Sequence, residues 1–340
     1  MKAAVFHGPR DVRTEEVDDP VLLPGDVLVK IIACGICGSD LHSYKHGLFP
    51  EWGAAVRTGR VYGHEFGGVV TEIAGEAPGL KVGDRVTGIC TGCAAEYVRV
   101  PFVILPAFRI VPPNISLEEA ATTEPLANSV HAVRIAGLSD GQTAVIIGAG
   151  IIGLGVIQVV KAKHDVRVIA VDYSQKRLDV ALQLGADAII NAEREDAFRA
   201  ILEATGASTV LYDDEPAAEV DVVFECAGAG RDQKGEVALQ QALRIVKEGG
   251  KIVVVSVAER LVEIASALLV RKGVTIAGSW AWTLDDFDEA IALMTAHKVD
   301  RRPLISHEFS IDGAKEAYEM ALSAEESVKV LIKPWGEAKL

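Results

Sequence analysis

Three residue types that bind zinc lie close together near the start of the chain. Cys37 opens the run Cys-Gly-Ser-Asp-Leu-His over residues 37–42, and His64 and Glu65 follow after a short interval. A thiolate, an imidazole and a carboxylate can hold a catalytic Zn²⁺ and leave one coordination position open. Each also has a structural interpretation, since Cys37 can be a small buried hydrophobe and His64 with Glu65 a buried hydrogen-bonded pair. Their joint occurrence favours the metal site.

A second group of residues is typical of dinucleotide binding. Residues 148–153, the glycine turn, read Gly-Ala-Gly-Ile-Ile-Gly between an expected strand and an expected helix. Glycines there permit a tight turn, let the backbone approach a pyrophosphate and allow close packing of helix on strand, and the helix N-terminus offers amide donors to phosphate. Such a turn can also join a strand to a helix without binding any ligand, and the context favours the cofactor. The expected cofactor-binding residues are Gly148, Gly150, Ile151, Ile152, Gly153, Asp172 and Arg177.

The end of the next expected strand indicates which dinucleotide binds. Asp172 stands there, where a carboxylate can accept both ribose hydroxyls of NAD and would repel the 2′-phosphate of NADP. Arg177 either lies along the adenosine or partly offsets that repulsion. We therefore expect NAD as the cofactor.

The composition excludes several classes of protein. The 340-residue chain carries a formal net charge of −14, and phosphates of nucleic acid or of an anionic membrane would repel it. The N-terminus shows no export pattern, and the apolar run over 145–160 is interrupted by glycines and too short to span a membrane. Five cysteines are too few, and odd in number, for a disulfide framework. We expect a cytoplasmic protein that acts on a small molecule.

The order of expected elements indicates an α/β protein with two domains. The first third predicts many short strands separated by Gly and Pro, typical of a small β-barrel, and the glycines at 67–68 permit a bulge or a close approach of backbone. From Thr143 onward apolar strands alternate with helices, which indicates a doubly wound parallel sheet covered on both faces. We expect a discontinuous catalytic domain from 1–125 and 280–340, and a nucleotide-binding domain from 126–279.

Four motifs occur together and in a familiar order. They are the run from Cys37 to His42, Gly63-His64-Glu65, Glu124-Pro125-Leu126-Ala127, and the glycine turn with Asp172. With them, nearly the whole chain resembles the zinc-dependent medium-chain dehydrogenase/reductases, which include alcohol, polyol, butanediol and threonine dehydrogenases. The resemblance implies a GroES-like β-barrel catalytic domain, a Rossmann domain, and reversible hydride transfer between NAD and an alcohol.

The resemblance also implies roles at the expected metal site. Cys37 and His64 resemble zinc ligands, and Glu65 resembles the neighbouring carboxylate that either binds zinc or exchanges with water. Glu124 stands where polyol-type relatives carry Glu, and it would bind zinc directly or through the bound water. Asp40 resembles the carboxylate that orients the zinc-binding histidine.

Proton transfer and phosphate binding complete the roles that the resemblance implies. Ser39 and His42 resemble a proton relay: Zn²⁺ acidifies an alcohol hydroxyl, Ser39 passes the proton onward, and His42 releases it near neutral pH. We therefore predict Ser39, His42 and Glu65 as catalytic residues. Lys329 resembles a basic residue that contacts cofactor phosphate.

The chain departs from many of these enzymes where they hold a second, structural zinc. Relatives carry four closely spaced cysteines there, whereas this chain has Cys90 and Cys93 alone before the barrel strands resume. A closed structural site takes four protein ligands, so we expect one catalytic zinc per chain and no structural zinc. A redox-sensitive pair, or metal captured between subunits, remains an alternative for these two cysteines.

The substrate is constrained by resemblance alone. Glu124 with its three successors, and residues 279–287, resemble polyol- and diol-type members, which favours a secondary alcohol, diol or polyol. An amino alcohol such as threonine is the next expectation. The competing hypotheses are a non-catalytic nucleotide-binding protein on the same scaffold, and a zinc-dependent reductase or lyase-like relative that acts on another carbonyl compound.

Two further expectations concern surfaces. The resemblance implies a homodimer or homotetramer, joined edge to edge near residues 274–282, where an exposed edge strand would have to be covered. The aromatic residues expected to wall a substrate pocket are Tyr44, Phe49, Trp52 and Trp280.

Overall fold

The structure of the protein is a computed structural model that describes residues 1–47, 58–210, 215–231 and 235–336. Its contacts divide the chain into one unit of Met1–Glu124 with Arg301–Leu340 and a second unit of Pro125–Asp300. The predicted boundary at residue 280 lies before the end of the second unit at Asp300. The contact division therefore places helix α9 (Leu284–Thr295) in the second unit. The buried Asp286 of α9 lies 2.9 Å from the ring of His131 in that unit.

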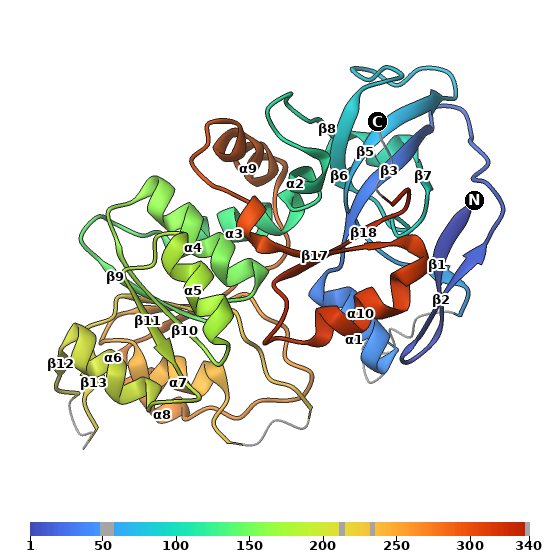
Figure 1. Ribbon diagram of the computed structural model, residues 1–340. Coiled ribbons are helices and arrows are strands. Elements are labelled where there is room, and N and C mark those ends of the chain that lie inside the picture. Colours follow the sequence, from blue (N-terminus) through green and yellow to red (C-terminus); the bar gives the residue numbers. More distant parts are fainter. Residues whose placement is uncertain (48–57, 211–214, 232–234, 337–340) are drawn as a thin grey trace. The chain divides into compact units, whose positions relative to one another are not determined.

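The first unit is built on two sheets (Figure 1). A three-stranded sheet has the order β2-β1-β4, and a larger sheet has the order β17-β18-β3-β5-β6-β8 with β7 paired to β3. The strands are β1 (Lys2–Gly8), β2 (Asp11–Glu16), β3 (Val27–Gly35), β4 (Arg60–Val61), β5 (Glu65–Ile73), β6 (Arg85–Ile89), β7 (Tyr97–Val100), β8 (Arg109–Ile110), β17 (Ile305–Ser310) and β18 (Lys329–Lys333). The β-rich first third that the sequence predicts is confirmed.

Short helices pack against the strands of this unit. Figure 1 shows α1 and α10 next to one another, and the two helices are in contact. The helices of the unit are α1 (Gly38–His46), α2 (Leu117–Ala120) and α10 (Ala314–Leu322), with short 3-10 turns at Phe102–Ala107, Arg302–Leu304 and Ile311–Gly313. Ser116 and Glu119 cap α2 reciprocally. The close backbone approach expected at 67–68 is also confirmed, since a Cβ on Gly67 would overlap the carbonyl oxygen of Leu117.

The second unit contains a parallel sheet of the order β11-β10-β9-β14-β15-β16. Apolar residues of these strands form its core, because helices cover the sheet and leave the strands buried. The strands are β9 (Thr143–Ile147), β10 (Arg167–Asp172), β11 (Ala188–Asn191), β14 (Val222–Glu225), β15 (Lys251–Val254) and β16 (Thr275–Gly278), with a small pair β12 (Ala207–Ser208) and β13 (Ala217–Ala218). The helices are α3 (Thr123–Ala136), which begins at the boundary, α4 (Ile151–Lys163), α5 (Gln175–Gln183), α6 (Ala197–Thr205), α7 (Ala238–Ile245), α8 (Ser266–Lys272) and α9.

The strand order reverses at β9, which has β10 on one side and β14 on the other. In open parallel sheets, ligands bind beyond the carboxyl ends of the strands at such a switch point. The predicted Rossmann arrangement is confirmed, and the glycine turn follows β9 at this point. Within the described residues, no helix combines the length and apolar character that crossing a membrane requires.

Candidate functional site

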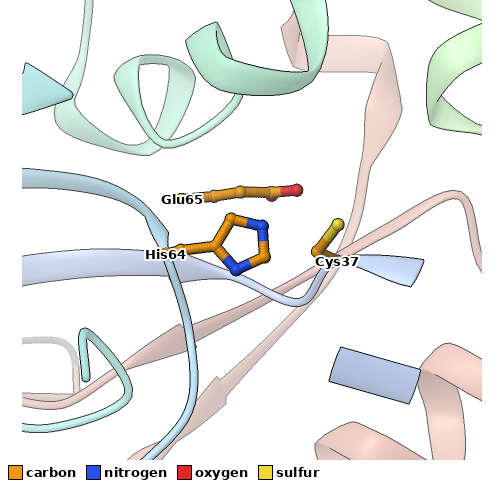
Figure 2. A group of neighbouring side chains, drawn as sticks. All are labelled: Cys37, His64 and Glu65. Atoms are coloured by element: carbon orange, nitrogen blue, oxygen red, sulfur yellow. The ribbon is translucent and has the colours of Figure 1, made fainter. Parts of the chain in front are cut away.

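Cys37, His64 and Glu65 meet at one end of the barrel sheet. Cys37 directly precedes α1. His64 directly precedes β5, and Glu65 is the first residue of that strand, where it pairs with Gly35 at the end of β3. One possible ligand atom from each side chain lies within 4.8 Å of the others, and Figure 2 shows the three side chains converging. A thiolate, an imidazole and a carboxylate at this separation can hold one Zn²⁺.

Glu65 is held by a buried lysine that lies far away in sequence. Its Oε2 accepts a hydrogen bond of 2.6 Å from Nζ of Lys329, which also donates to the carbonyl oxygen of Ile36 at 2.9 Å. Both side chains of the pair are only 1% exposed. Lys329 is therefore buried against Glu65, and the expected contact of Lys329 with a cofactor phosphate is not what the structure shows.

The other oxygen of Glu65 has no hydrogen-bond partner among the described residues. Oε1 is buried, and a buried acceptor without a partner carries a desolvation penalty. Gly35 leaves the room that this carboxylate needs, because a Cβ there would overlap Oε2 of Glu65. A metal ion would supply the missing partner of Oε1, so these residues fit the zinc that the sequence predicts.

The electrostatic field at the group favours a cation. Burial alone would lower the pKa of His64, but the negative charges of Cys37, Asp40 and Glu65 outweigh it and raise that pKa to about 11. Asp40 is buried; its Oδ1 lies 3.7 Å from Nδ1 of His64, and its Oδ2 accepts a hydrogen bond of 3.0 Å from the Cys37 amide. Asp40 thus lies beside the imidazole and fixes the start of α1, as the orienting role requires.

Ser39 and His42 lie three residues apart on α1, so they project from neighbouring positions of one helix face. Ser39 is exposed and His42 is half-buried. Glu124, at the start of α3, is buried and contributes to raising the pKa of Lys329. Its carboxylate is outside the group whose atoms all lie within 4.8 Å.

The glycine turn in the second unit is packed too closely for larger residues. Gly148 has a φ of +100°, and a Cβ there would lie 2.9 Å from the amide nitrogen of Ala227. A Cβ on Gly153 would overlap the carbonyl oxygen of Gly148. Gly150 precedes α4, whose first residues Ile151 and Ile152 are half-buried. The start of a helix such as α4 can bind an anion through its backbone amides.

Asp172 lies at the end of β10 and holds the glycine turn in place. Its Oδ2 accepts a hydrogen bond of 2.7 Å from the Ala149 amide, and its Oδ1 accepts one of 2.8 Å from the Ser174 amide. The carboxylate keeps further lone pairs for ribose hydroxyls. Arg177 lies beside the same turn: its Nη1 is 3.9 Å from where a Cβ on Gly150 would stand, and burial lowers its pKa.

The aromatic residues expected at a substrate pocket have different surroundings. Tyr44 is fully buried, and its hydroxyl donates to Glu319 at 2.6 Å, so it belongs to the core of the first unit. Trp280 is 78% exposed. Phe49 and Trp52 lie outside the described residues.

The sequence does not reveal the contacts that Lys329 and Gly35 make with Glu65 at the candidate metal site. Lys329 is 264 positions from Glu65, so no spacing motif connects them. A lysine within an apolar strand was the one available signal, because a buried lysine needs an anionic partner.

Comparisons with known proteins agree with this geometry. Residues 23–106 match the family described as alcohol dehydrogenase GroES-like domain, and residues 152–296 match the family described as zinc-binding dehydrogenase. The chain is 30% identical to sorbitol dehydrogenase of Bacillus subtilis, over 98% of this chain and 97% of that protein.

Solved structures show the same relation. The crystal structure of 2R,3R-butanediol dehydrogenase from Bacillus subtilis superimposes with a TM-score of 0.82 at 30% identity, over 98% of this chain and 99% of that one. A zinc-binding dehydrogenase from Sinorhizobium meliloti 1021 bound to NADP gives a TM-score of 0.81 at 27% identity, with coverage of 98% and 99%.

Proposed function

Because the chain belongs to the zinc-binding alcohol dehydrogenase family, whose members are oxidoreductases, we propose that it transfers hydride between NAD and a secondary alcohol, diol or polyol. The observation that carries the proposal is the group of Cys37, His64 and Glu65, in which one buried oxygen of Glu65 has no hydrogen-bond partner among the described residues. A nucleotide-binding protein without catalysis has no use for such a group.

We propose that one zinc ion per chain binds here. Cys37, His64 and Glu65 would supply three ligands, and Glu124 would act through a bound water, because its carboxylate is outside the 4.8 Å group. Zinc bound there acts as a Lewis acid toward the alcohol or ketone oxygen. Lys329 holds Oε2 of Glu65 and so directs Oε1 toward the metal.

The proton of the alcohol would leave through α1. Ser39 is exposed and can accept that proton and pass it to His42, one helical turn away. Imidazole side chains can exchange protons with water near neutral pH. This route makes Ser39 and His42 the proposed catalytic residues together with Glu65.

NAD is proposed over NADP on the contacts of Asp172. Its carboxylate is fixed by two backbone amides at the end of β10, where the 2′-phosphate of NADP would meet a negative charge. The Sinorhizobium relative bound NADP in its crystal, so the two cofactors must be compared directly for this chain. Arg177 is the residue that would support any binding of NADP.

The substrate class rests on the relatives' names. Proteins named for sorbitol and for 2R,3R-butanediol support a polyol or vicinal diol as substrate. Threonine remains the second candidate on the family resemblance alone. We further propose a cytoplasmic homo-oligomer joined at β16, which is the edge strand of its sheet and lies next to the exposed Trp280.

The first experiment measures zinc per chain in protein purified without added metal, followed by initial rates with NAD and NADP on a panel of diols, polyols and threonine. We expect one zinc, faster turnover with NAD, and oxidation of vicinal diols or polyols. The variant Cys37→Ser should lose zinc and activity, while Cys226→Ser, which changes a half-buried cysteine of the second unit, should keep both. Failure to bind zinc on reconstitution would refute the mechanism, and NAD binding without turnover would favour the non-catalytic alternative.

A further inference from the structure

Two cysteines that the proposed reaction does not use lie side by side in the turn that follows β6. Cys90 and Cys93 follow β6 in the turn Cys-Thr-Gly-Cys, and their side chains are 4% and 0% exposed. The Cys93 thiol donates to the carbonyl oxygen of Cys90 at 2.9 Å, and the two thiols also interact with each other. Neither cysteine belongs to a group of three or more possible metal ligands among the described residues.

The backbone of this turn is bonded to the residue that precedes His64. The amides of Gly92 and Cys93 both donate to the carbonyl oxygen of Gly63, at 2.9 and 3.1 Å. The next amide, that of Ala94, donates to the carbonyl oxygen of Tyr62 at 2.9 Å. A displacement of the turn therefore acts directly on the chain segment that presents His64.

Gly63 has no spare space in which to absorb such a displacement. Its φ is +85°, and a Cβ there would lie 2.5 Å from the sulfur of Cys34 and 2.9 Å from the amide nitrogen of Ala94. Closely packed interiors transmit small shifts to their neighbours. The position of Gly63, and with it the position of His64, depends on the geometry of the cysteine turn.

We propose that Cys90 and Cys93 form a reversible disulfide with hydrogen peroxide as oxidant, and that this disulfide weakens metal binding by displacing His64. The Cys90 thiolate attacks one peroxide oxygen and gives a sulfenic acid, with the other oxygen leaving as water after protonation. The Cys93 sulfur then attacks the sulfenic sulfur and expels a second water. Two thiols lose two electrons and two protons, and one peroxide is reduced to two waters.

The chemistry of the individual thiols supports this pair over the other buried cysteines. The neighbouring Cys93 side chain lowers the pKa of Cys90, which favours the thiolate that reacts with peroxide. Burial raises the pKa of Cys34 and Cys226 well above the ordinary thiol value, so both are expected to react slowly. A sulfur–sulfur bond is about 2.05 Å long, so its formation must draw the two thiols together and move the turn.

The test treats the zinc-loaded protein with hydrogen peroxide and follows three quantities: intact mass, the disulfide found by peptide mapping, and zinc released to a chromogenic chelator. We expect a loss of about 2 Da, which is two hydrogens, mapped to Cys90 and Cys93. Zinc release should become at least tenfold faster, and dithiothreitol should reverse both changes. Cys90→Ser and Cys93→Ser should each abolish the mass loss, whereas Cys226→Ser should respond like the wild type.

These readouts need neither substrate nor NAD, so they are independent of the proposed dehydrogenase activity. If the chain binds no zinc, the rate of Cys37 alkylation before and after oxidation reports the same displacement. Oxidation of Cys37 without a disulfide between Cys90 and Cys93 would overturn the proposal. So would a disulfide that forms without changing zinc release or Cys37 alkylation.

Discussion

The buried pair of Lys329 and Glu65 can be tested by removing its positive charge. In Lys329→Met the aliphatic bulk is largely kept, while Glu65 loses the ammonium group that lies 2.6 Å from its Oε2. With an effective dielectric constant of about 20, the attraction at that separation is about 6 kcal/mol. Breaking such a buried pair costs about 3–5 kcal/mol, because the remaining carboxylate is partly relieved by taking up a proton.

The assay is unfolding of the metal-free protein by heat and by guanidinium. A loss of about 4 kcal/mol should lower Tm by roughly 10 °C in a unit of this size. The matched control is Glu65→Gln with Lys329→Met, which removes both charges and should recover most of the loss. If the single variant is as stable as the wild type, or if the double variant is no better than the single one, the electrostatic reasoning fails.

The pH dependence of the same variant provides a second check. Burial alone would lower the pKa of Lys329, but the charge of Glu65 raises it, so the pair's contribution is complete below the ordinary lysine pKa and is lost only at strongly alkaline pH. The wild type should therefore show no effect of this pair between about pH 6 and 9. In Lys329→Met the isolated carboxyl group should gain protons on folding, so that variant should become relatively more stable as pH falls.

Three further predictions concern other parts of the chain. Asp172→Asn should raise the KM for NAD by about tenfold or more with a smaller effect on kcat, because its carboxylate holds the glycine turn and, in the proposed complex, would contact the ribose; initial-rate kinetics with both cofactors checks this. Gly153→Ala should weaken NAD binding and destabilise the protein by about 1–3 kcal/mol, because the new methyl group would overlap the Gly148 carbonyl; titration of NADH fluorescence and thermal unfolding measure the two effects. Hydrogen bonds from backbone amides and a guanidinium hold the pKa of Asp26 below its usual value, so its contribution to stability is lost as pH falls. Asp26→Asn should therefore show a smaller loss of stability between about pH 5 and 3 than the wild type, measured as the free energy of unfolding of both proteins across this range.

The parts of the molecule that the sequence predicts are those that local spacing encodes. The glycine turn is predictable because its strand, its turn and its helix are contiguous, and the ligand types at Cys37, His64 and Glu65 limit the chemistry. The fold class followed from the change from short β segments to alternating strands and helices. The boundary at residue 280 differs from the contact division because α9 is tied to α3 through Asp286 and His131, a tertiary contact that no local pattern reports.

The role of Lys329 shows where local reasoning ends. A lysine in the final strand is compatible with binding a cofactor phosphate until its burial and its partner are known. Strand β18 pairs with β3 beside Gly35, and this pairing carries Lys329 to Glu65 across the sheet. Only the sheet order, which is non-local, brings the two charges together.

The proton held by His64 in the metal-free protein should affect zinc binding itself. The surrounding anionic groups raise the pKa of His64 to about 11, so His64 is expected to hold its proton in the metal-free protein even at alkaline pH. Zinc binds the neutral imidazole and the thiolate, so this proton must leave when the metal enters. The number of protons released can be measured by calorimetry in buffers of different ionisation enthalpy.

A pH of about 9.5 distinguishes His64 with its raised pKa from an ordinary histidine. An isolated histidine with a pKa near 6.5 and an isolated cysteine with a pKa near 8.5 would by then have lost nearly all their protons, and zinc would release about 0.1 proton. His64 with its raised pKa should still release about one, and the apparent affinity should rise about tenfold per pH unit below that pKa. Asp40→Asn removes one of the charges that raise the pKa of His64, so it should lower the pH at which proton release ends. Release of no proton by the wild type at this pH would mean that the anionic field around His64 is much weaker than the structure indicates.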